Sequence, residues 1–196
     1  MATPDDESRT LRAYFSRFKA ILEDIDIDQI ARIAQELKEA KVRGGKIFVC
    51  GNGGSAALAS HFVTDLGSGS VSRGEHFPLI SLVDCSPAIT AAGNDFGYES
   101  IFARQLTSMA TRADLLFAIS SSGNSQNLIN GVTTAKTIGM RSCGLLGFDG
   151  GKLASELDVA LIVRSKIGEY GPVEDAHSSI LHAVTELLRN GKRLDP

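Results

Sequence analysis

The sequence has no tryptophan, no cluster of basic residues and no apolar run longer than a β-strand. Its 20 lysine and arginine residues are outnumbered by 23 acidic residues, which argues against a nucleic-acid-binding surface. Strand-sized apolar runs are too short to span a membrane. The first residues, MATPDDESRT, are polar and acidic, which does not suit a signal peptide. We therefore expect no nucleic-acid partner and no membrane association.

Cysteine is also scarce, with three residues and no C-x-x-C pair. Cys50 and Cys143 fall in predicted buried strands, where a free thiol packs as a small apolar residue. Free thiols without a disulfide framework fit a reducing compartment, so we expect a cytoplasmic protein. A catalytic thiol is the alternative to core packing.

The length and composition predict one α/β domain over residues 1–196, since 43% of residues are hydrophobic and 22% charged. Residues 1–43 contain two predicted amphipathic helices, the second capped by Asp28, and 44–190 form the α/β core. The apolar stripes of the two helices need a partner. A second subunit would make them an oligomerisation segment, and packing on their own domain is the alternative.

The core begins with an apolar strand, 47–50, followed directly by the glycine-rich turn GNGGS and an alanine-rich helix. A helix that starts after such a turn offers free backbone N–H groups and a positive dipole end to an anion. Ser55 either caps the helix or donates its hydroxyl. The spacing is neither that of a Rossmann fingerprint nor that of a P-loop. A tight turn without a ligand is the alternative interpretation.

A second loop of the same kind strengthens the anion-binding interpretation. The apolar strand 115–119 runs into SSSGNS at 120–125, and helical periodicity resumes afterwards. Four serines around one glycine provide many neutral donors on one loop. Binding a phosphate is the function that most needs such a set.

Strands alternate with helices along the chain, which predicts a parallel sheet with helices on both faces. The predicted strands are 47–50, 78–83, 115–119, 141–146 and 159–163, with a short helix at 87–92 and a final helix at 172–189. The two donor loops both follow strand carboxyl ends, so we expect them to share one pocket.

Two carboxylate–imidazole pairs complete the candidate site. His61 and Asp65 share a helix face, and Glu174 and His182 lie within reach of one pocket on the last helix. If the helices meet, the four side chains suit zinc or form a general acid and base. The alternative for each histidine is a hydrogen-bonded structural role, which we assign to His76. His177 is predicted to support the site from behind or to be exposed.

These motifs together resemble the sugar isomerase (SIS) domain family, and most closely the sedoheptulose 7-phosphate (phosphoheptose) isomerases. The matching stretches are CGNGGSAALASHF (50–62), AAGNDFGYESIFARQL (91–106), ISSSGNSQNLI (119–129), GFDGGKLA (147–154) and EDAHSSILH (174–182). The resemblance implies a flavodoxin-like three-layer sandwich and a homotetramer with active sites between subunits.

The resemblance also implies roles for individual residues. The predicted phosphate ligands are Ser55, Ser120, Ser121, Ser122 and Ser125; the predicted sugar contacts are Asn52, Gly53, Asp95 and Glu174; and the predicted zinc ligands are His61, Asp65, Glu174 and His182. The family has glutamate where this chain has Asp65 and glutamine where it has Glu174. It often has an arginine where this chain has Gly69, which Arg73 would replace.

The resulting prediction is a sugar-phosphate isomerase that converts sedoheptulose 7-phosphate to a manno-heptose 7-phosphate through an enediol. Asp65 would abstract the proton and His182 would move protons on the oxygens. The alternatives are a non-catalytic phosphosugar-binding SIS module, acting as a regulator or as an assembly factor for the replication initiator, and an isomerase for another phosphosugar.

Overall fold

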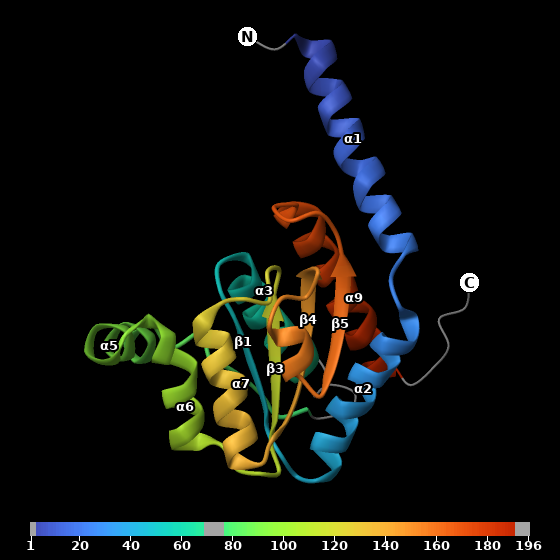
Figure 1. The fold of residues 1–196 in the computed structure, drawn as a ribbon. Coiled ribbons are helices and arrows are strands. Elements are labelled where there is room, and N and C mark those ends of the chain that lie inside the picture. The colour runs from blue at the N-terminus through green and yellow to red at the C-terminus, as the bar shows by residue number, and fades with distance from the viewer. Residues whose placement is uncertain (1–2, 69–76, 191–196) are drawn as a thin grey trace.

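The structure is a computed structural model that describes residues 3–68 and 77–190, with the backbone alone at residue 190. A five-stranded parallel sheet of order β2-β1-β3-β4-β5 forms its centre (Figure 1). The strands are β1 (Ile47–Gly51), β2 (Leu79–Ser81), β3 (Leu115–Ser120), β4 (Arg141–Phe148) and β5 (Val159–Arg164). The helices are α1 (Pro4–Glu23), α2 (Ile27–Val42), α3 (Gly54–Phe62), α5 (Ser86–Phe96), α6 (Ile101–Met109), α7 (Gln126–Ile138), α8 (Leu153–Glu156) and α9 (Tyr170–Asn190), with the π-helical η1 (Val63–Ser68) and the 3₁₀ η2 (Tyr98–Ser100).

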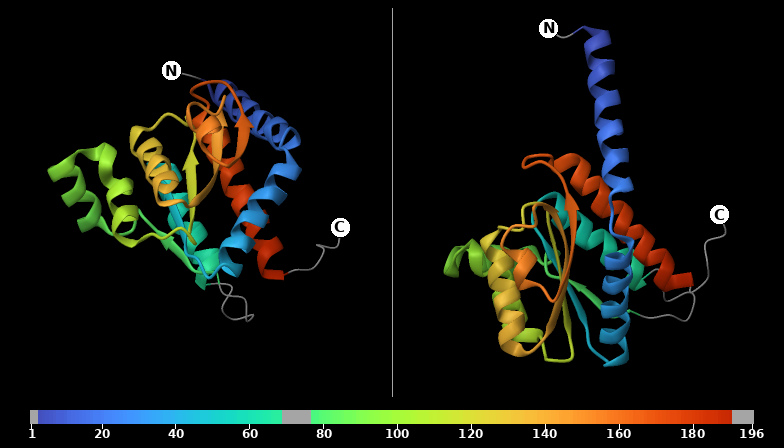
Figure 2. Two further views of the ribbon diagram at one scale, coloured as in Figure 1. Left: turned by 60° about the horizontal axis from the view of Figure 1, so that its bottom comes forward. Right: turned by 45° about the vertical axis from the view of Figure 1, so that its right-hand side comes forward.

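Alternating side chains of the strands feed two hydrophobic cores, one on each face of the sheet. From β1, Ile47 and Val49 join the core beneath α2, α3 and α9. Phe48 and Cys50 point the other way, into the core beneath α5, α6 and α7. Figure 2 shows the resulting three layers, with the sheet between these helix groups. The predicted five-stranded parallel α/β sandwich is confirmed.

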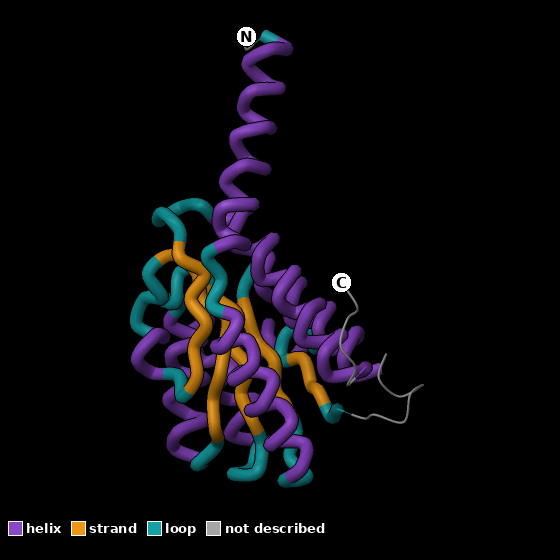
Figure 3. Tube along the Cα trace, turned by 90° about the vertical axis from the view of Figure 1, so that its right-hand side faces the viewer, coloured by secondary structure: helices purple, strands orange, loops and turns teal. Residues whose placement is uncertain are grey.

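Helix α1 projects beyond the three layers and contacts α9 near its base (Figure 3). Arg17 forms a two-pronged ion pair with Glu169, whose closest nitrogen–oxygen distance is 2.8 Å. Tyr14 donates a hydrogen bond to Asp175, and this bond raises the pKa of the Tyr14 phenol to about 12. Beyond these contacts, large apolar side chains of α1 are exposed, among them Phe15.

Element boundaries differ from the predictions in three informative places. Asp26 rather than Asp28 caps α2, because its carboxylate accepts from the N–H of Gln29, and Asp28 lies inside the first turn. The predicted strand 78–83 is shorter, Leu79–Ser81, at the edge of the sheet. The predicted helix 87–92 extends over Ser86–Phe96 and ends at Gly97, where φ is +88°.

No helix in the described ranges is long and apolar enough to cross a membrane.

Candidate functional site

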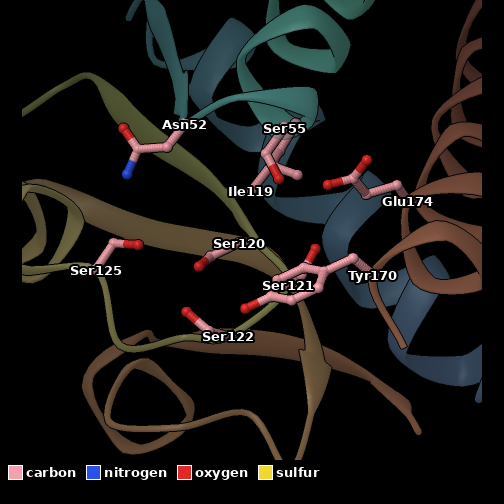
Figure 4. Close-up of a pocket in the computed structure, with 9 residues that line it drawn as sticks. All are labelled: Asn52, Ser55, Ile119, Ser120, Ser121, Ser122, Ser125, Tyr170 and Glu174. Carbon is pink, nitrogen blue, oxygen red and sulfur yellow. The ribbon is translucent and has the colours of Figure 1, made fainter. Parts of the chain in front are cut away.

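The strand order reverses direction between β1 and β3, which places the candidate site. Gly51 at the end of β1 pairs in register with Ile119 near the end of β3, so the two following loops start side by side. In open parallel sheets ligands bind at such a switch point, outside the strand carboxyl ends. A cavity of about 160 Å³ opens there (Figure 4). It is lined by Asn52, Ser55, Ile119, Ser120, Ser121, Ser122, Ser125, Tyr170 and Glu174.

The serine loop after β3 is held by a hydrogen bond within the loop and by close packing of Gly123 against Gly150. Gly123 donates its N–H to the Ser120 hydroxyl over 3.0 Å. Gly123 has φ +62°, and a Cβ there would lie 1.9 Å from the Gly150 carbonyl oxygen. The Ser121 hydroxyl oxygen is buried with no hydrogen-bond partner, and Ser125 precedes α7 without capping it by its side chain. The loop therefore keeps hydroxyl groups available to a ligand.

The glycine turn after β1 brings a second helix N-terminus to the cavity. Gly53, at φ +53°, is the residue that precedes α3, and no side chain caps that helix. The predicted capping role of Ser55 is therefore wrong, because the helix has already begun at Gly54. Ser55 instead lies in the first turn, 4% exposed, with its side chain in the cavity. The backbone N–H groups of the first turn of α3 and the Ser55 hydroxyl are a second set of hydrogen-bond donors at the cavity.

A pair of side-chain amides links the two loops. Asn52 and Asn127 exchange hydrogen bonds of 2.9 and 2.8 Å, from the turn after β1 and from α7. Tyr98 of η2 donates to the Asn52 side-chain oxygen over 3.0 Å. Asn127 is 2% exposed, so the pair is largely shielded from water. The sequence reasoning missed Asn127 and Tyr98, because their partner lies far away in the chain.

The wall contributed by α9 carries Tyr170 and Glu174. A Cβ on Gly54 would lie 2.3 Å from a Glu174 carboxylate oxygen, so this carboxylate rests against the start of α3. Within the described part of the chain, no lysine, arginine or histidine lines the cavity. An anion bound there is surrounded by neutral donors, two helix N-termini and one carboxylate.

A second cluster lies further along α3 and α9, and it brings together three of the four predicted zinc ligands. The Oδ2 atom of Asp65 lies 3.1 Å from Nε2 of His61 and 3.7 Å from Nε2 of His182. One ligand atom from each residue lies within 4.8 Å of the others. Zinc ligands at about 2.0–2.2 Å from the ion are about 3.3 Å apart, so the arrangement fits a three-ligand site.

Other predicted site residues lie elsewhere. Glu174 faces the cavity and is outside the metal cluster, so His182 pairs with Asp65 rather than with Glu174. Asp95 lies on α5 beside a different surface cavity, together with Phe96 and Arg104.

His177 is neither exposed nor part of the cluster. It is fully buried, and its Nε2 lies 3.1 Å from the Leu146 carbonyl oxygen. Burial lowers the pKa of His177 to about 4. Arg73 and His76 lie outside the described residues.

Comparison with known proteins identifies the family. The model of the SIS domain matches residues 13–147. A phosphoheptose isomerase of Syntrophotalea carbinolica is 35% identical over 181 residues, which cover 91% of each chain. The solved phosphoheptose isomerase of Neisseria gonorrhoeae has a TM-score of 0.83 at 30% identity and covers 95% of this chain and 98% of its own. That of Francisella tularensis has a TM-score of 0.85 at 27% identity, with coverages of 96% and 99%.

The fold and the shared sequence make this chain a member of the SIS domain family. Within that family it belongs to the phosphoheptose isomerases, which are sugar-phosphate isomerases. The family prediction made from the sequence is confirmed.

Proposed function

We propose that the protein interconverts sedoheptulose 7-phosphate and a manno-heptose 7-phosphate, binding the phosphate in the serine-lined cavity. The distance between the serine-lined cavity and the cluster of His61, Asp65 and His182 is the observation that carries this proposal. Ser55 and His61 are six residues apart on α3, which corresponds to about 9 Å, and Glu174 and His182 are eight apart on α9, about 12 Å. Three bonds of an extended chain span about 3.3–3.6 Å, so the eight bonds from C1 to phosphorus of a heptose 7-phosphate span about 9–10 Å. A phosphate in the cavity therefore puts C1 and C2 beside the Asp65 cluster.

The chemistry requires one proton to move between C1 and C2 and further protons to move on the two oxygens. Asp65 is the base for the carbon-bound proton, and its carboxylate lies between the imidazoles of His61 and His182. His182 moves protons on the oxygens. The interactions with the remote phosphate hold the reacting carbons against these side chains.

His61, Asp65 and His182 would also hold a zinc ion, since their donor atoms and spacing fit a catalytic site with three protein ligands. A bound zinc ion would supply Lewis-acid polarisation of the substrate carbonyl. Glu174 belongs to the phosphate cavity in this proposal and is not a zinc ligand.

The working form is proposed to be a cytoplasmic homo-oligomer, a tetramer by family resemblance. Helix α1 supports this, because it projects from the rest of the molecule (Figure 3) and exposes 62% of Leu11 and 65% of Phe15. Active sites between subunits remain a prediction, as does the contact of Asp95 with the sugar.

The test is direct conversion of sedoheptulose 7-phosphate, followed by NMR with and without zinc. We expect aldose product from the unchanged protein and a loss of at least a hundredfold in rate for His182→Ala. The matched control is Asp175→Asn, which alters α9 outside the cavity and should keep the rate within about twofold. Binding of the sugar phosphate without turnover would contradict the isomerase and favour a binding module.

A further inference from the structure

The hydroxyl of Tyr170 differs from those of the other tyrosines in its hydrogen bonding. The chain has three tyrosines. Tyr14 donates to Asp175 and Tyr98 donates to Asn52, so both hydroxyls have protein partners. The Tyr170 hydroxyl makes no hydrogen bond within the described ranges, and its ring lines the serine cavity (Figure 4). A phenolic hydroxyl can donate one hydrogen bond to an anion. Tyr170 therefore presents an unused donor to the cavity.

The Tyr170 ring, which is 53% exposed, contacts one aromatic side chain. The Phe148 ring lies edge-on to it, with centroids 5.1 Å apart and an interplanar angle of 77°. Phe148 has φ +54° and is the one non-glycine residue with positive φ among those described. A bulky residue in that region is strained, and such strain persists where the surroundings enforce it, often at ligand sites. The Phe148 ring in this conformation packs against Tyr170, which lines the cavity.

The segment that leads into Tyr170 is also held in place. The neighbouring Glu169 accepts bonds from the Arg17 guanidinium on α1 and from the Lys166 N–H. These bonds lower the pKa of the Glu169 carboxyl, with the Arg17 hydrogen bond as the main cause. A donor on a held backbone loses less freedom when it binds a ligand than one on a mobile loop does.

The cavity needs a donor on this side. The serine loop and the start of α3 supply hydroxyl and N–H groups from two directions, and no basic side chain from residues 3–68 or 77–189 lines the cavity. On the α9 wall, the Glu174 carboxylate oxygens accept hydrogen bonds and do not donate them. Tyr170 is thus the side-chain donor that α9 contributes to a cavity that is also lined by Ser121, whose buried hydroxyl oxygen has no hydrogen-bond partner.

We propose that the Tyr170 hydroxyl donates a hydrogen bond to the phosphate group of the bound ligand, so that α9 contributes a neutral donor to the serine-lined cavity. This assignment rests on the proposed function, because it concerns the same phosphate cavity. It adds a third structural element to the two donor loops, and it links the base of α1 to ligand binding through Arg17 and Glu169.

The test uses Tyr170→Phe, which keeps the ring and its contact with Phe148 but removes the donor. Calorimetric titration with inorganic phosphate and with sedoheptulose 7-phosphate measures the affinity of each ligand. We expect both affinities to fall by the same factor, about tenfold, as for loss of a hydrogen bond to a charged group at a half-exposed site. The matched control, Tyr14→Phe, removes a hydroxyl outside the cavity and should change both by less than about twofold.

Unchanged phosphate affinity in Tyr170→Phe would overturn the assignment. So would a loss confined to the sugar phosphate, since it would place the hydroxyl on the sugar. Turnover is scored separately: if the sugar phosphate binds with the expected Tyr170 dependence but is not converted, only the proposed function fails. If neither ligand binds the unchanged protein, both fail.

Discussion

Replacing Glu174 by glutamine should tighten phosphate binding, although Glu174 lines the proposed phosphate cavity. The carboxylate rests against the first turn of α3, and no basic side chain from the described residues lines the cavity to offset its charge. A dianionic ligand therefore meets a negative charge inside its own cradle. Glutamine keeps the size of the side chain and removes that charge.

The cavity size sets the magnitude. A sphere of 160 Å³ is about 7 Å across, so a phosphate inside it lies roughly 4–7 Å from the Glu174 carboxylate. Two unit charges about 6 Å apart repel by about 0.7 kcal/mol in bulk water and about 2.8 kcal/mol at an effective dielectric constant of 20. Glu174 is partly exposed, so the repulsion lies toward the lower value, about 1–2 kcal/mol. The expected gain in affinity is about 5- to 30-fold.

The assay is calorimetric titration of inorganic phosphate into the unchanged protein and into Glu174→Gln, at low and high salt. Screening should narrow the difference as salt rises. Asp175→Asn is the matched control: it removes the same charge one residue later, outside the cavity, and should change affinity by less than about twofold. Equal or weaker binding by Glu174→Gln would refute the reasoning. Equal tightening by Asp175→Asn would instead assign the effect to net charge.

Two further predictions concern the shape of the site and its support. Gly123→Ala should abolish measurable phosphate binding and lower the melting temperature, because its Cβ would lie 1.9 Å from the Gly150 carbonyl oxygen at φ +62°; unchanged titration and melting curves would contradict this. Burial lowers the pKa of His177 from 6.5 to about 4 in the folded protein. Between these pH values the unfolded chain therefore binds more protons than the folded chain. The free energy of unfolding should fall by about 2 kcal/mol from pH 7.5 to pH 5. Urea unfolding at both pH values measures this, and a His177→Gln variant with the same pH dependence would argue against it.

The sheet and the donor loops were predictable because their signals are local. Apolar runs such as 115–119 predict buried strands, and the glycine and serine turns mark strand carboxyl ends. The register of β1 with β3 then brings the loops together, as expected for a parallel sheet. The family resemblance supplied roles that periodicity could not give, above all those of Asn52, Gly53 and Asp95 as predicted sugar contacts.

The parts that the sequence could not supply depend on contacts between distant elements. Helical spacing places Glu174 within reach of the pocket that His182 faces, but it does not show how α9 is positioned along α3. That packing decides that His182 meets Asp65, while Glu174 meets Gly54 two turns earlier. Tyr170 carried a weak local signal, an aromatic residue two positions before the predicted start of the last helix, and only the folded structure shows that it lines the cavity.

Asp65 and Glu174, the two residues that differ from the family pattern, are therefore expected to affect different steps, proton transfer and phosphate binding respectively. Glu174 lines the proposed phosphate cavity, and Asp65 lies between the two imidazoles about 9–12 Å away along the helices. Charge at 174 acts equally on bound substrate and transition state, because the phosphate does not change during isomerisation. Glu174→Gln should accordingly lower KM with kcat nearly unchanged, whereas Asp65→Asn should lower kcat by orders of magnitude with little effect on KM. A steady-state analysis in which Glu174→Gln chiefly lowered kcat would place its carboxylate with the reacting carbons and contradict the division of the site into these two centres.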